Sequence, residues 1–72
     1  MSFQAYLDNV RTKTGQSPDD LLARAVDKGL ADDKDLAPGI KAGAVIDWLK
    51  ADYGLGHGHA MSIVAFIKGK RA

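Results

Sequence analysis

The sequence predicts an all-α protein, a compact bundle of four short helices joined by glycine-rich corners. Apolar residues recur at intervals of three and four along four segments. Capping residues or glycines bound these segments, and no stretch alternates apolar and polar residues as a half-buried strand does. With 72 residues, 46% of them hydrophobic, the chain has the size and composition of one small domain spanning residues 1–72.

The first two predicted helices have clear start and stop signals. The first begins after Ser2, a good N-cap, and stops at Gly15. The second begins after Ser17, with Pro18 in the first helical position and acids in the first turn, and it ends at Gly29. Their apolar faces consist of Phe3, Tyr6, Leu7 and Val10 in the first helix and of Leu21, Leu22, Ala25 and Val26 in the second.

The second half of the chain contains a loop and two further helices. Residues 31–39 (ADDKDLAPG) form a polar loop with no period of its own. The third helix covers about residues 41–53, and Gly54 is its expected left-handed cap. The fourth covers about residues 58–68 and is apolar almost all round, which is typical of a helix at the centre of a bundle or at an interface. We expect the most buried set to be Phe3, Leu7, Val10, Leu22, Val26, Val45, Ile46, Leu49, Ile63, Val64 and Ile67.

The segment GLGHGHA, which begins at Gly54, joins the last two helices. The spacing of its glycines, followed by Ala60 and Ile63, resembles the helix-hairpin-helix motif of DNA-binding proteins that lack sequence specificity. In such a corner Gly54 ends one helix at positive φ, Leu55 fills the groove between the helices, and Gly56 leaves room for a phosphate. The same residues would also make a structural corner that binds no ligand.

The phosphate hypothesis depends on free backbone N–H groups at the positive end of the fourth helix. Residues 40–72 hold five bases against two acids, whereas residues 17–36 hold six acids against three bases. Because the net charge is only +1, we expect at most weak nucleic-acid binding through the C-terminal half. The proposed contact residues are Gly56, His57, Gly58 and His59, assisted by Lys41, Lys50, Lys68, Lys70 and Arg71.

Metal binding and catalysis are both disfavoured. Two histidines at i and i+2 point about 200° apart on a helix, and the chain has no cysteine and no third histidine to complete a metal site. His59 and Ser62 could act as base and nucleophile, but nothing in the sequence nominates a group to orient the base or to bind an oxyanion. We therefore expect a non-enzymatic protein without metal or cofactor.

A protein-interaction or self-association module is the alternative. It would use Trp48, Met61 and Phe66 on the apolar flanks of the third and fourth helices, with Trp48 about half buried. Salt distinguishes the two hypotheses, because counterions compete with binding to a phosphate backbone and have little effect on an apolar interface. The partner would then be another protein or a second copy of the chain.

The expected location is the cytoplasm. No apolar run approaches the roughly 20 residues that cross a bilayer. The N-terminal MSFQAYLDNV is unlike a signal peptide, and the absence of cysteine fits a reducing compartment. We expect no contact with a membrane.

Three segments also support a resemblance over nearly the whole chain. They are SFQAYLDN, KTGQSPDDL and the tract from Gly39 to Gly69, GIKAGAVIDWLKADYGLGHGHAMSIVAFIKG. In this order they resemble the small bacterial family catalogued as domain of unknown function 4287. The resemblance implies a bacterial, cytoplasmic, helical module, and it implies no activity and no binding residues.

Overall fold

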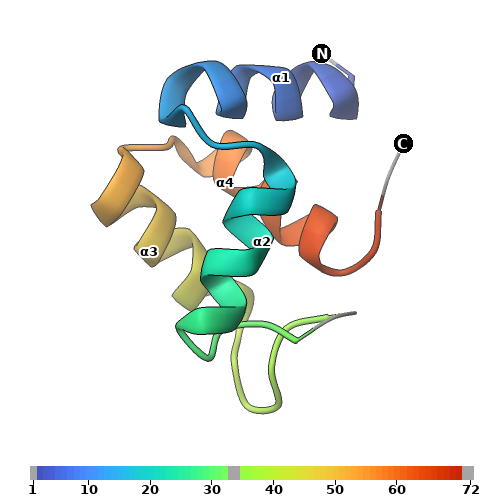
Figure 1. Cartoon of the computed structure of the whole chain (residues 1–72), viewed down its shortest axis with the longest axis vertical. Coiled ribbons are helices and arrows are strands. Elements are labelled where there is room, and N and C mark those ends of the chain that lie inside the picture. Colours follow the sequence, from blue (N-terminus) through green and yellow to red (C-terminus); the bar gives the residue numbers. More distant parts are fainter. Residues whose placement is uncertain (1, 33–34, 71–72) are drawn as a thin grey trace.

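The structure is a computed structural model that describes residues 2–32 and 35–70. Its four helices are α1 (Phe3–Thr14), α2 (Pro18–Asp27), α3 (Ala42–Tyr53) and α4 (His57–Ile67). In Figure 1, α1 lies across one end of the molecule, and α4 runs beneath it and behind α2. The described residues form no strand, and their single bridge joins Ala31 to Leu36. The all-α prediction is confirmed, and each helix ends within one or two residues of its expected boundary.

Serine caps begin the first two helices, as predicted. The Ser2 hydroxyl accepts a hydrogen bond from the N–H of Ala5, at 3.2 Å. The Ser17 hydroxyl accepts one from the N–H of Asp20 at 3.1 Å, and the Asp20 carboxylate accepts one from the N–H of Ser17 at 3.3 Å. This reciprocal pair is a capping box, which satisfies donors that the helix itself leaves without partners.

The fourth helix is the centre of the bundle. α4 packs against α1, α2 and α3. It contributes Ala60, Ile63, Val64, Phe66 and Ile67 to the buried core, which explains why so little of its circumference is polar. The remaining buried apolar residues are Leu7, Val10, Leu21, Ala25, Ala31, Val45, Trp48, Leu49 and Leu55.

The predicted core is wrong on the second helix. Val26 is 40% exposed and Leu22 is only partly buried, whereas Leu21 and Ala25 are fully buried. Leu21 and Ala25 are four residues apart and share one narrow face, which α2 turns towards the core. Phe3 and Ile46, also expected in the core, are partly buried at its edge.

The loop between α2 and α3, predicted to be polar, contributes apolar residues to the core. Ala31 is 5% exposed and belongs to the core, and Leu36 packs against that core. The N–H of Ala37 donates to the carbonyl of Leu30 at 3.1 Å, which holds the two arms of the loop together. The apolar members of ADDKDLAPG therefore help to close the end of the bundle away from α1 (Figure 1).

Candidate phosphate-binding corner

The turn from α3 to α4 has the geometry expected for its first two residues. Gly54 ends α3 with φ of 66°, in the left-handed region, and its N–H donates to the carbonyl of Lys50 at 3.0 Å. This bond, from the first residue beyond the helix to the carbonyl four residues earlier, is that of the αL type of helix ending. The N–H of Leu55 also donates to the carbonyl of Leu49, at 3.4 Å. The Leu55 side chain is 1% exposed, so it fills the space between the helices and anchors the corner to the core.

Gly56 is the N-cap of α4 and is exposed to solvent. Its φ of −70° and ψ of 164° are open to any residue, and a Cβ at this position would meet no atom within 4 Å. Because glycine has no side chain, Gly56 offers no oxygen to the N–H groups of His57, Gly58 and His59 in the first turn. The fold does not require glycine here, and its effect is to leave these donors uncapped by the N-cap residue.

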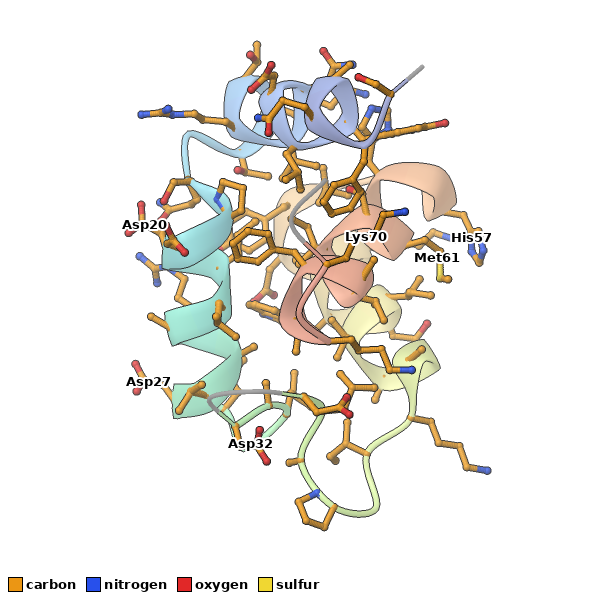
Figure 2. The ribbon with its side chains drawn as sticks, turned by 90° about the vertical axis from the view of Figure 1, so that its right-hand side faces the viewer. Asp20, Asp27, Asp32, His57, Met61 and Lys70 are labelled. Carbon is orange, nitrogen blue, oxygen red and sulfur yellow. The ribbon has the colours of Figure 1, made fainter. Side chains whose placement is uncertain are left out.

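The two histidines of the corner do not converge. His57 is exposed and points away from the bundle (Figure 2), whereas His59 is partly buried. The His59 ring lies edge-on to Tyr6, with 5.1 Å between the ring centroids, and its Nε2 atom is buried without a hydrogen-bond partner in the described part of the chain. Within residues 2–32 and 35–70, no three His, Cys, Asp or Glu side chains gather into a group that could hold a metal ion.

The expected set of basic residues does not form one patch around the corner. Lys41 precedes α3 and Lys68 follows α4, so each lies one helix length from the corner. Lys50 lies in the last turn of α3, next to Gly54. Lys70 turns back towards α1, and Arg71 lies outside the described residues. The remoteness of Lys41 and Lys68 follows from the predicted helix bounds, because each lies at the far end of a helix that meets the corner, whereas the direction taken by Lys70 depends on tertiary packing.

A shallow groove of about 350 Å³ continues from the corner along α4. Gly58, Met61 and Ala65 lie on its α4 side, and Phe3 and Tyr6 of α1 also line it. Lys70 borders the same groove, with Nζ 5.0 Å from the centroid of the Phe3 ring. Phe3 and Tyr6 were not predicted to be part of a site, because their spacing in α1 is that of a core face. Only the polar end of the tyrosine could have hinted at an exposed position.

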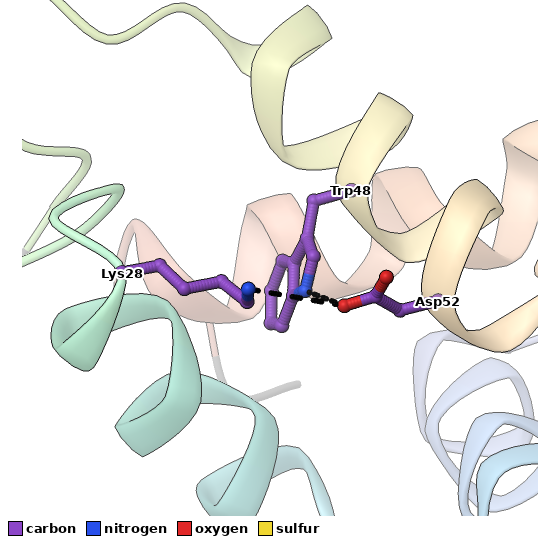
Figure 3. Close-up of polar contacts among 3 residues, drawn as sticks. All are labelled: Lys28, Trp48 and Asp52. Carbon is purple, nitrogen blue, oxygen red and sulfur yellow. Dashed lines mark hydrogen bonds and ion pairs between the residues drawn. The ribbon is translucent and has the colours of Figure 1, made fainter.

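The alternative interaction surface is not assembled as expected. Trp48 is 8% exposed and Phe66 is 6% exposed, whereas Met61 is 40% exposed. Trp48 is therefore buried rather than half buried. Its Nε1 donates to the Asp52 carboxylate at 2.8 Å, and the same carboxylate lies 3.9 Å from the Lys28 ammonium (Figure 3).

Ser62 and His59 are not arranged as a nucleophile and its base. Ser62 is 6% exposed, and its hydroxyl donates to the backbone carbonyl of His59 at 2.5 Å. The hydroxyl thus satisfies its donor within the first turns of α4, and a buried hydroxyl with such a partner is typical of helix packing.

These features define a small all-α protein with a tight helix–corner–helix element. The chain belongs to the family described as Domain of unknown function (DUF4287), whose family model matches residues 2–69. Comparisons with curated proteins and with solved structures found no match. Among the described helices, none combines the length and the apolar character needed to span a membrane.

Proposed function

We propose that this protein is a non-enzymatic binding module of the bacterial cytoplasm that contacts the phosphates of nucleic-acid backbones through the corner between α3 and α4. One observation carries the proposal: the exposed N-cap of α4 is a glycine, although neither the backbone angles nor the space around it requires one. A phosphate oxygen at Gly56 would accept hydrogen bonds from the first-turn N–H groups, at the positive end of the helix dipole.

The charges near the corner support an anionic ligand. Lys50 lies within one turn of Gly54, and Lys70 borders the groove that starts at Gly58. Asp20 and Asp27 of α2 lie on the opposite side of the view from His57 in Figure 2. With few cations and a net charge of +1, the module should bind weakly and lose affinity as salt rises.

Two glycines allow a matched test by fluorescence anisotropy with a labelled DNA duplex at low salt. Gly56→Asp adds a carboxylate that can cap the first turn of α4 and repel phosphate. Gly43→Asp makes the same change of charge in the first turn of α3, at a glycine that also has no atom within 4 Å of its Cβ position. The Gly56→Asp protein should bind the duplex at least about ten-fold more weakly than wild type, because it loses charge-assisted hydrogen bonds to phosphate. The affinity of the Gly43→Asp protein should stay within about two-fold of wild type.

Salt provides the second arm of this test. If two or three phosphates are contacted, raising salt from 50 to 200 mM should weaken binding by roughly ten-fold or more. Equal losses in the two aspartate variants would reduce the proposal to an effect of net charge. If the protein self-associates to the same extent at all salt concentrations and does not bind DNA, the protein-interaction alternative around Met61 would be favoured.

A further inference from the structure

The groove between α1 and α4 contains apolar and aromatic residues that contact with a nucleic-acid backbone would not require. Two partly buried aromatic residues, Phe3 and Tyr6, line it together with the exposed Met61, and Lys70 borders it. Among the described residues, no Asp or Glu lines this groove. Its occupant should therefore combine negative charge with flat apolar surface.

We propose that the ligand of this module is single-stranded nucleic acid, with one base inserted in the groove against Phe3 and Tyr6. This inference rests on the proposed function, because it places the neighbouring phosphates at the start of α4 and at Lys70. Proteins that bind single strands without sequence preference combine cations along the backbone with aromatic side chains on which bases stack. In a duplex the flat faces of the bases are covered by their neighbours, so a duplex could use only the corner.

The arrangement of the groove fits this ligand. Its α4 side extends from Gly58 to Ala65, a distance of about 10 Å along a helix. The uncapped turn of α4 lies at one end, and Lys70, held over the Phe3 ring, lies towards the other. The edge-on contact with His59 fixes the Tyr6 ring beside Gly58, where a Cβ would be 3.6 Å from Tyr6 Cε1. The positive end of the α4 dipole thus lies at one end of the aromatic wall formed by Phe3 and Tyr6, and the Lys70 ammonium lies towards the other.

Two probes of equal charge separate stacking from phosphate contact. One is a thymidine octanucleotide, and the other is an abasic octanucleotide with the same backbone. If one base stacks, wild type should bind the thymidine strand about five-fold to 100-fold more tightly than the abasic strand. Octaglutamate serves as an anionic peptide probe.

The aromatic contribution is tested with a matched pair of variants. Tyr6→Leu should abolish most of the preference for the thymidine strand. Tyr53→Leu makes the same change beside the mixed-charge groove of Lys28 and Asp52 and should retain the preference. Should Tyr6→Leu fail to fold, wild type still decides the matter, because stacking must shift the ring protons of Phe3 and Tyr6 with the thymidine strand and not with the abasic one.

Each outcome has one meaning. Equal affinity for the thymidine and abasic strands would overturn the stacking proposal and leave phosphate binding intact. Binding of the duplex as tightly as the thymidine strand would do the same. Failure of every nucleic acid at low salt would overturn both proposals, and binding of octaglutamate alone would assign the groove to an acidic protein segment.

Discussion

The helices α2 and α4 begin in opposite ways. α2 starts with Ser17 and Asp20, whose side chains and backbone N–H groups bond to each other. α4 starts at Gly56, which has no side chain. Closing a helix start with its own side chains stabilises the fold, whereas leaving it open keeps the donors accessible to an external acceptor.

The absence of a side-chain cap does not by itself distinguish α4, because α3 also begins without one, at Lys41. The start of α4 differs in its surroundings. It follows the buried plug Leu55, which fixes its position, and it continues into the groove bordered by Lys70. The start of α2 therefore serves the stability of the fold, and we propose that the start of α4 serves ligand contact.

The largest predicted effect on stability concerns Leu55, the buried residue of the corner between α3 and α4. Leu55→Ala should lower the free energy of unfolding by about 2–5 kcal/mol, because it leaves a cavity under the turn. Val26→Ala is the control, since Val26 is 40% exposed and its truncation should cost less than about 0.5 kcal/mol. Chemical denaturation of both variants checks this. Similar midpoints for the two would show that Leu55 does not hold the corner.

The next effect concerns the left-handed glycine before that anchor. Gly54→Ala places a Cβ at φ of 66° and should destabilise the protein by about 1–2 kcal/mol. Gly43→Ala lies in a helix with open space at the Cβ position and should stabilise it by up to about 1 kcal/mol. Thermal melts of the two variants should therefore shift in opposite directions. A Gly54→Ala protein as stable as wild type would contradict the assigned conformation.

Much of this corner could be predicted from the sequence. The left-handed Gly54 and the buried Leu55 follow from local rules, since a helix end and its plug depend on neighbours along the chain. The positions of Lys41 and Lys50 relative to Gly56 also follow from the predicted helix, because Lys41 begins α3 and Lys50 lies in its last turn. The groove and the position of Lys70 depend instead on how the helices cross, because α1 and α4 together form them.

The same limit explains the errors in the core. An apolar period identifies a face of a helix to within a wide angle, and the choice of Leu21 over Val26 depends on where α4 packs. Trp48 was placed at the edge of its stripe, yet it is only 8% exposed, with its Nε1 bonded to Asp52 and the ammonium of Lys28, the C-cap of α2, 6.0 Å from its ring. The opposite error concerns Phe3 and Tyr6, which have the spacing of core residues but are only partly buried and line the groove between α1 and α4.

A smaller effect is expected when the side-chain cap of α2 is removed. Ser17→Ala should cost about 1 kcal/mol of stability, because the first turn of α2 loses its acceptor. It should leave DNA affinity unchanged, since α2 has no part in the proposed contact. Denaturation and anisotropy on the same sample measure both quantities. A marked loss of affinity in a folded Ser17→Ala protein would contradict the division of roles.

The smallest effect on stability comes from closing the open start. Gly56→Ser supplies a capping hydroxyl in a conformation that serine accepts, and it should change stability by only a few tenths of a kcal/mol. Affinity for DNA should nevertheless fall, because the hydroxyl takes a donor that phosphate would use. Unchanged affinity with the cap formed would remove the first-turn N–H groups from the proposed site.

The most direct test of the central claim is the map of amide chemical shifts during titration of the wild-type protein with a short single-stranded DNA at low salt. If the glycine corner binds phosphate, the amides of residues 56–59 should move first and that of Lys70 should follow. The amides of Asp19, Asp20 and Leu21 at the closed start of α2 should stay in place. An absence of shifts at residues 56–59, or equal shifts at the starts of α2 and α4, would contradict the claim that the glycine corner binds phosphate.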